Sequence, residues 1–117
     1  RDSQDYIQKK HNTEKNPVDF VFHGGSGSTP EEIKEAISYG VIKMNIDTDL
    51  QFAYTEGIRD YMVNNIDYLK AQIGNPTGAD SPNKKHYDPR KWIREGELTF
   101  NKRLEQAFAD LNNVNTL

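Results

Sequence analysis

The segment from residue 19 to residue 30 reads Asp19-Phe20-Val21-Phe22-His23-Gly24-Gly25-Ser26-Gly27-Ser28-Thr29-Pro30. Its apolar part is too short for a helix and is typical of a buried strand that ends at His23. Three glycines within four residues then indicate a tight loop, and Thr29-Pro30 indicates a helix start. Glycines let backbone N–H groups approach a ligand closely, and a helix start adds unpaired donors and a positive dipole end. The segment therefore predicts an anion site with a histidine beside it.

A second strand is expected soon after the first. Thr29 is suited to cap a helix and Glu32 stands three residues past it, as a capping box requires. Gly40 is typical of a helix end, and the apolar residues 41–46 then indicate a strand. In a parallel strand, helix, strand unit both strands end at the same edge. We therefore expect the glycine loop and the Asn45–Asp49 segment to be neighbours.

The rest of the chain predicts three helices and one long loop. A polar helix is expected over residues 2–11, before a first strand over residues 18–22. A longer helix over residues 49–64 carries an apolar stripe of Leu50, Ala53, Tyr54, Ile58, Tyr61 and Met62. Residues 73–90 are rich in Gly, Pro, Asn and Asp and indicate a mobile loop, which at this length is functional or disordered. A last helix is expected over residues 97–111, with a stripe of Leu104, Ala107, Phe108 and Leu111.

Composition narrows the classes of function. The chain has 117 residues and a formal charge of -3, so no basic excess is present to bind nucleic acid. Without cysteine it forms no disulfide or thiolate metal site, and a reducing, cytoplasmic compartment fits. No apolar run is long enough to cross a membrane. The hydrophobic share of 34% is low for a globular domain, so we expect a piece of a larger one.

The polar motifs allow several interpretations. No lysine follows the glycines as a Walker loop requires, and Pro30 occupies the last position of a G-x-G-x-x-G pattern. A small phosphate site and a purely structural turn remain open. Asn45, Asp47, Asp49 and Glu56 have EF-hand spacing, but Leu50 replaces the required glycine and a strand precedes them.

The histidine and the basic residues of the long loop also have two readings each. His23 is a hydrogen-bonded structural histidine or a metal ligand, and a catalytic zinc would need further ligands from elsewhere. Lys84, Lys85 and Arg90 are solvated surface charges, or else Arg90 closes a phosphate site by bidentate contact.

Five segments in one order carry a resemblance to a known family. They are Val21 to Ser28, Val41 to Asp49, Gly74-Asn75-Pro76, Pro82 to Lys85 and Tyr87-Asp88-Pro89-Arg90. Together they resemble the carboxyl-terminal part of a class II, zinc-dependent fructose-bisphosphate aldolase. The resemblance implies an α/β fold, a (β/α)₈ TIM barrel of which this chain supplies the last two strands and the carboxyl-terminal helices. Residues 1–117 would then be the carboxyl-terminal part of one domain whose first strands are absent.

The resemblance also implies roles for named residues. His23 matches a zinc ligand, and Gly24, Gly25 and Ser26 match a loop that binds the phosphate of dihydroxyacetone phosphate beside a Na⁺ or K⁺ ion. In the partner loop, Asn45 would contact the enediolate, and Ile46, Asp47 and Thr48 would line the phosphate end. Arg90, assisted by Lys84, would reach the other substrate phosphate from the neighbouring subunit of a homodimer.

The activity implied is the reversible cleavage of fructose 1,6-bisphosphate to dihydroxyacetone phosphate and glyceraldehyde 3-phosphate, with zinc as the Lewis acid. Two alternatives are a tagatose-bisphosphate aldolase and a non-catalytic fragment that binds sugar phosphates. No nucleic acid or membrane partner is implied. Because the other zinc ligands and the general acid and base are missing, we expect these 117 residues alone to be unstable and inactive.

Overall fold

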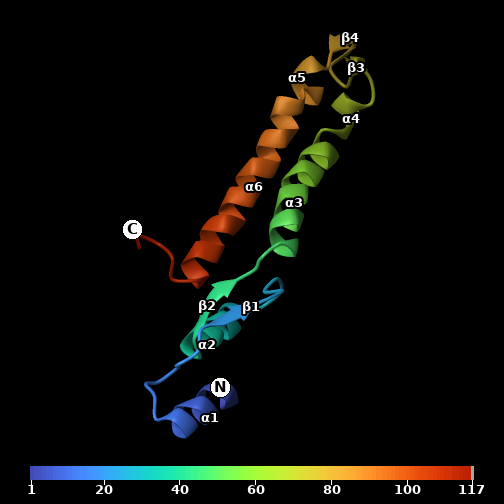
Figure 1. Cartoon of the computed structure of the whole chain (residues 1–117). Coiled ribbons are helices and arrows are strands. Elements are labelled where there is room, and N and C mark those ends of the chain that lie inside the picture. Colours follow the sequence, from blue (N-terminus) through green and yellow to red (C-terminus); the bar gives the residue numbers. More distant parts are fainter. Residues whose placement is uncertain (117) are drawn as a thin grey trace. The chain divides into compact units, whose positions relative to one another are not determined.

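The computed structural model describes residues 1–116 and divides into two compact units (Figure 1). The first unit comprises residues 1–49 with the chain end from Gln106, and the second comprises residues 50–105. Helices and strands follow one another as α1 (Asp2–His11), β1 (Phe20–Phe22), α2 (Pro30–Ser38), β2 (Val41–Met44), α3 (Thr48–Asn64), α4 (Ile66–Leu69), β3 (Ile73–Asn75), β4 (Gly78–Pro82), α5 (Lys84–Tyr87) and α6 (Pro89–Asp110).

The first unit contains the expected strand, helix, strand arrangement. Strands β1 and β2 pair in parallel, with Phe20 opposite Val41 and Phe22 opposite Met44. Both strands are shorter than predicted, because β1 begins at Phe20 and β2 ends at Met44. The ladder nevertheless continues for one bond beyond β2, since the Asn45 N–H donates to the Phe22 carbonyl at 3.0 Å. The carboxyl ends of the two strands therefore lie together.

The prediction of a buried first strand is wrong for the described chain. Val21 is 46% exposed and Phe22 is 36% exposed, although Ile33 of α2 is buried at 3%. Among residues 1–116, β1 and β2 pair only with each other, so a two-stranded ribbon leaves apolar surface uncovered.

Helix α2 begins and ends as the sequence predicts. The Thr29 hydroxyl accepts from the Glu32 N–H at 3.2 Å, and the Glu32 carboxylate accepts from the Thr29 N–H at 2.8 Å. This reciprocal pair is the predicted capping box. Gly40 follows the helix with φ +95°, a conformation that a residue with a side chain adopts only with strain.

A buried glutamine ties α1 to the sheet. Gln4 is 3% exposed, and its Nε2 donates to the carbonyls of Val18 at 2.6 Å and Tyr39 at 2.8 Å. Its Oε1 accepts from the Val18 N–H at 3.1 Å. One side chain therefore forms hydrogen bonds with backbone groups both before β1 and at the end of α2.

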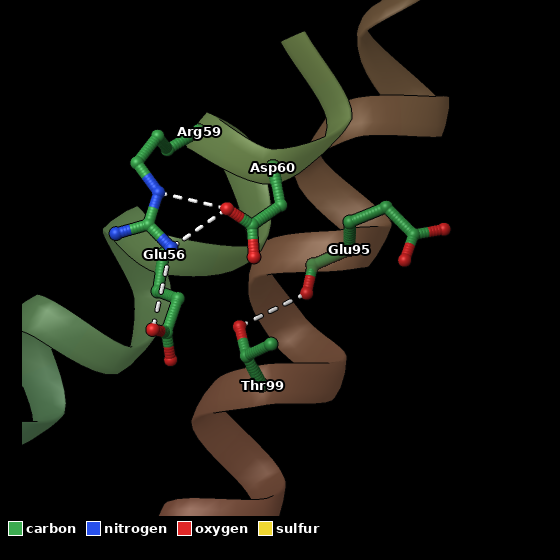
Figure 2. Close-up of polar contacts among 5 residues, drawn as sticks. All are labelled: Glu56, Arg59, Asp60, Glu95 and Thr99. Carbon is green, nitrogen blue, oxygen red and sulfur yellow. Dashed lines mark hydrogen bonds and ion pairs between the residues drawn. The ribbon is translucent and has the colours of Figure 1, made fainter. Parts of the chain in front are cut away.

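In the second unit, two glycines bring α3 and α6 into close contact. A Cβ atom on Gly57 would lie 2.3 Å from the Glu95 carbonyl, and one on Gly96 would lie 3.0 Å from the Tyr54 carbonyl. Tyr54 and Phe100 also meet edge to face, with ring centroids 6.4 Å apart. Figure 2 shows the polar surroundings: Arg59 pairs with Glu56 and Asp60 on α3, while the Thr99 hydroxyl donates to the Glu95 carbonyl on α6.

The prediction of a long loop over residues 73–90 is wrong. This segment forms β3, β4, α5 and the start of α6. Strands β3 and β4 form an antiparallel hairpin. The reason is Asn83, which is completely buried and whose amide donates to the carbonyls of Ala71 at 2.8 Å and Gly74 at 2.9 Å. Asn75 donates to the Asn83 Oδ1 at 2.7 Å. Polar side chains therefore organise a segment that composition alone indicated to be irregular.

Helix α6 begins eight residues earlier than the predicted start at residue 97. The Asp88 carboxylate accepts from the Arg90 N–H at 3.1 Å, which is the geometry of a helix cap, and Pro89 follows in the first position. Of the two predicted apolar stripes, Ala53 and Ala107 are buried, but Phe108 is 42% exposed. No helix formed by residues 1–116 combines the length and apolar character that crossing a bilayer requires.

Candidate functional site

The glycine loop and the segment after β2 lie together, as the sequence predicts. The Gly25 N–H donates to the Asn45 carbonyl at 3.0 Å, and the Asp49 N–H donates to the Ser26 hydroxyl at 3.3 Å. The Asp49 carboxylate in turn accepts from the Gly27 N–H at 3.3 Å. Three hydrogen bonds therefore join the glycine loop to Asn45 and to the first turn of α3, about twenty residues further along the sequence.

These bonds determine which backbone donors of the loop remain for a ligand. The N–H groups of Gly25 and Gly27 are used as above, and the Ser28 N–H donates to the Gly25 carbonyl at 3.2 Å. No hydrogen bond among residues 1–116 uses the N–H of Gly24 or Ser26. The loop can therefore present these two donors to an anion, as in other backbone anion sites.

Close packing and positive φ angles explain the glycines in this loop. Gly25 is buried, and a Cβ there would lie 2.6 Å from both Cγ and Sδ of Met44. Gly24 has open space around it but adopts φ +68°, a backbone conformation that residues with a side chain rarely adopt. A side chain at Gly24 would strain the backbone, whereas one at Gly25 would require the Met44 side chain to move.

His23 and Asn45 are in direct contact at the ends of the two strands. The Asn45 Nδ2 lies 3.0 Å from the His23 Nδ1, and the imidazole is exposed. An amide N–H can only donate, so in this orientation the ring accepts at Nδ1 and carries its proton on Nε2. Rotation of the amide would instead let its Oδ1 accept from the Nδ1–H of the ring, which leaves the Nε2 lone pair free for a metal. The orientation of the Asn45 amide therefore determines which ring nitrogen of His23 has a free lone pair.

His23 fits a metal site as one ligand among several. Within residues 1–116, no group of three or more His, Cys, Asp or Glu side chains is placed to hold a metal ion. The exposed imidazole at the strand end is nevertheless a suitable donor, because neutral imidazole is a common metal ligand and a neighbouring polar group fixes its tautomer. The EF-hand alternative is excluded, since the segment before Asn45 is strand β2.

The remaining predicted residues of the partner loop adjoin Asn45. Ile46 is half-buried, whereas Asp47 and Thr48 are exposed, and Thr48 is the first residue of α3. Thr48 thus places a hydroxyl at a helix start close to the glycine loop, where anions are favoured.

The predicted basic residues Lys84 and Arg90 belong to the second unit. Pro82, Lys84, Lys85, Asp88 and Lys91 line an open hollow of about 660 Å³ there. The Arg90 side chain is 86% exposed and pairs with Asp88, whose side chain is 18% exposed. Hydrogen bonds from Arg90 lower the pKa of Asp88 to about 2, and the same pairing raises the pKa of Arg90.

Sequence reasoning missed the roles of Asp49 and Asp88. Asp49 was placed in the right segment, but nothing in its spacing indicated that it would accept from Gly27. For Asp88 a signal was present, because Asp followed by Pro is typical of a helix cap and first position.

The chain is similar in sequence and in structure to known proteins. The family model described as "Fructose-bisphosphate aldolase class-II" matches residues 3–116. The chain therefore belongs to the class II fructose-bisphosphate aldolase family.

Individual relatives give the extent of the similarity. "Fructose-bisphosphate aldolase class 2" of Escherichia coli (strain K12) is 57% identical over 117 residues, which is 100% of this chain and 33% of that protein. The "Fructose-bisphosphate aldolase" of Neurospora crassa is 59% identical over 115 residues, covering 97% of this chain and 32% of that protein. A crystal structure of fructose-bisphosphate aldolase from Campylobacter jejuni superposes with a TM-score of 0.89 at 56% identity, covering 99% of this chain and 34% of that one. The chain thus spans about a third of the length of the relatives it matches.

Proposed function

We propose that the complete protein cleaves fructose 1,6-bisphosphate reversibly to dihydroxyacetone phosphate and glyceraldehyde 3-phosphate. In this reaction the C3–C4 bond breaks and its electron pair stays on the three-carbon ketone fragment. The C4 hydroxyl gives up its proton as the aldehyde forms, and C3 takes up a proton to give dihydroxyacetone phosphate. The observation that carries the proposal is the contact between His23 and Asn45 beside the glycine loop. The relatives' names favour fructose over tagatose bisphosphate as the substrate.

The phosphate of the ketone fragment would bind at the glycine loop. Gly24 and Ser26 supply the N–H groups that no residue of the described chain accepts from, and Gly25 keeps the loop close to Met44. Ile46, Asp47 and Thr48 would complete the phosphate end from the partner loop. Oriented N–H groups bind a phosphate dianion without needing to reorganise, which favours its retention through the reaction.

Asn45 is proposed as a catalytic residue. Its amide reaches the imidazole of His23 and lies at the strand edge where the sugar carbon chain would pass. An amide N–H placed there can donate to the oxygen that gains negative charge when the C3–C4 bond breaks.

His23 would hold a divalent metal, Zn²⁺ in our proposal, together with ligands outside these residues. When bound, the metal supplies Lewis-acid polarisation of the substrate carbonyl. A Na⁺ or K⁺ ion near Gly24 and Ser26 would offset the charge of the phosphate. Both assignments follow from the chemistry of these donors and from family membership.

The architecture proposed for the complete protein is a (β/α)₈ barrel, with residues 1–117 as its carboxyl-terminal part. In this arrangement β1 and β2 are the last two strands. Their exposed Val21, Phe22 and Ile42 would be covered by the remainder of the barrel. We also propose a homodimer in which Arg90, with Lys84 beside it, reaches the second substrate phosphate in the neighbouring active site.

The test is the rate of dihydroxyacetone phosphate formation from fructose 1,6-bisphosphate by the complete protein. We expect activity that a chelator abolishes and that Zn²⁺ restores. A protein that binds the bisphosphate but never cleaves it, with or without metal, would be a non-catalytic binding module and would contradict the proposal.

A further inference from the structure

Arg90 is held by one neighbour in a defined orientation. Its Nε donates to Asp88 Oδ1 at 2.9 Å, and one terminal nitrogen donates to Asp88 Oδ2 at 2.5 Å. The two parallel bonds form a bidentate pair, which fixes the plane of the guanidinium as well as its position. A mostly exposed arginine is thereby restrained by a carboxylate that is itself largely covered.

The donors of the guanidinium divide into a used edge and an outward edge. Arginine has five N–H groups, and Asp88 accepts from one on Nε and one on a terminal nitrogen. The other three lie on the two terminal nitrogens, and within the described residues no side chain other than Asp88 accepts from this guanidinium. The outward edge is itself a fork that matches two oxygens of a phosphate.

The charges around Arg90 also favour its pairing with Asp88. Lys84, Lys85 and Lys91 line the hollow that also contains Asp88, so the carboxylate lies among cations. Hydrogen bonds from Arg90, with Lys84 nearby, lower its pKa to about 2, so the carboxylate is ionised at neutral pH. Asp88 can therefore accept from Arg90 at that pH.

We propose that Asp88 is a positioning residue, which holds Arg90 with its outward edge ready to bind a phosphate group of the substrate. This inference rests on the proposed function, because it deepens the role given there to Arg90. Ordering a long side chain at a binding site opposes binding, and a side chain ordered in advance avoids that loss. The negative charge of Asp88 acts against a phosphate, but Lys84, Lys85 and Lys91 line the same hollow and offset it.

Asp88 also caps α6, so the variants must separate the two roles. Serine and asparagine cap a helix about as well as aspartate does. Asp88→Ser keeps the cap but its short hydroxyl cannot accept from both nitrogens of Arg90. Glu97→Gln is the matched control, because it removes the carboxylate that pairs with Arg94 at 2.8 Å on the same helix.

The experiment measures two quantities in the complete enzyme: KM for fructose 1,6-bisphosphate and the dissociation constant of inorganic phosphate by ³¹P NMR. We expect Asp88→Ser to raise both by roughly threefold to tenfold, the range for ordering one long side chain, with kcat nearly unchanged. Glu97→Gln should change neither. Arg90→Met should raise both at least as much, and Asp88→Ser added to Arg90→Met should have no further effect.

Two results would overturn the inference. Tighter phosphate binding by Asp88→Ser would show that Asp88 competes with the ligand instead of preparing its site. If Asp88→Ser weakened phosphate binding as much in the Arg90→Met variant as in the unchanged enzyme, Asp88 would not act through Arg90. Phosphate binding requires no turnover, so a protein that shows these phosphate effects but cleaves no bisphosphate would contradict the proposed function and leave this inference intact.

Discussion

Gln4 connects three backbone groups of the first unit through one buried amide. Replacing it by alanine would leave the carbonyls of Val18 and Tyr39 and the Val18 N–H without their partner. Buried polar groups that lose a partner cost about 1–3 kcal/mol. We therefore expect Gln4→Ala to lower the free energy of unfolding of the complete protein by about 2–4 kcal/mol, measured by urea denaturation.

Lys9→Ala is the control, because Lys9 is exposed on the same helix. It should change the unfolding free energy by less than about 0.5 kcal/mol. Equal effects of the two substitutions would show that the hydrogen bonds of Gln4 do not stabilise the unit.

The Asp88 carboxylate offers a test by pH. Its pKa of about 2 lies below the ordinary value of 3.8, so the pairing with Arg90 stabilises the fold fully above pH 3.8 and is lost as the pH falls through about 2. At pH 3.8 we expect the carboxyl ¹³C shift of Asp88 to report an ionised group. In Arg90→Met the pKa of this carboxyl should rise toward its ordinary value, so the same carbon should report a larger protonated share at that pH, although the backbone N–H of residue 90 and Lys84 would still lower the pKa.

At the residue scale, the sequence predicted the residues at the ends of β1 and β2 better than the buried polar residues that support the fold. His23, Asn45 and the glycine loop could be placed because strand ends and glycine runs have local signals. Gln4 and Asn83 could not, because their value depends on carbonyls that only the folded chain brings near them. Polar residues are usually exposed, and the sequence contains no signal for the few that are buried.

Helix contact in the second unit depends on Gly57. We expect Gly57→Ala to lower the unfolding free energy by about 1–3 kcal/mol, the usual range for overpacking. Alanine is the better helix former by ~1 kcal/mol, but its Cβ would lie 2.3 Å from a backbone carbonyl that α6 cannot easily move. Thermal or urea denaturation measures the change.

Thr55→Ala provides the comparison on the exposed side of α3. It should leave the unfolding free energy within about 0.5 kcal/mol. If Gly57→Ala instead stabilises the protein, helix propensity outweighs the contact and the packing described for α3 and α6 is incorrect.

At the element scale, prediction succeeded where a short-range rule applied. The capping box of α2 and its glycine stop are local, so their positions were predicted to the residue. The hairpin of β3 and β4 was missed because Gly, Pro and Asn indicate irregular structure on average. Here Asn75 and Asn83 use their amides to hold the hairpin together, a role that composition does not reveal.

At the scale of the whole molecule, the chain spans part of the length of its relatives, and in our proposal it supplies part of the site. It matches about a third of each relative and contributes a single histidine to the proposed metal. The exposed apolar residues of β1 and β2 are what we expect of strands that belong to a larger sheet. The order of five short motifs was enough to predict the family. The further metal ligands that we propose lie outside these residues, so this sequence could not identify them.

The central claim is that His23 holds the catalytic metal beside the glycine loop. The most direct measurement is the zinc content per protomer of the complete protein, determined together with cleavage of fructose 1,6-bisphosphate. His11 is an exposed histidine of α1 and gives a matched control. We expect His23→Ala to lose both zinc and activity and His11→Ala to keep both, whereas full zinc occupancy in His23→Ala would contradict the account.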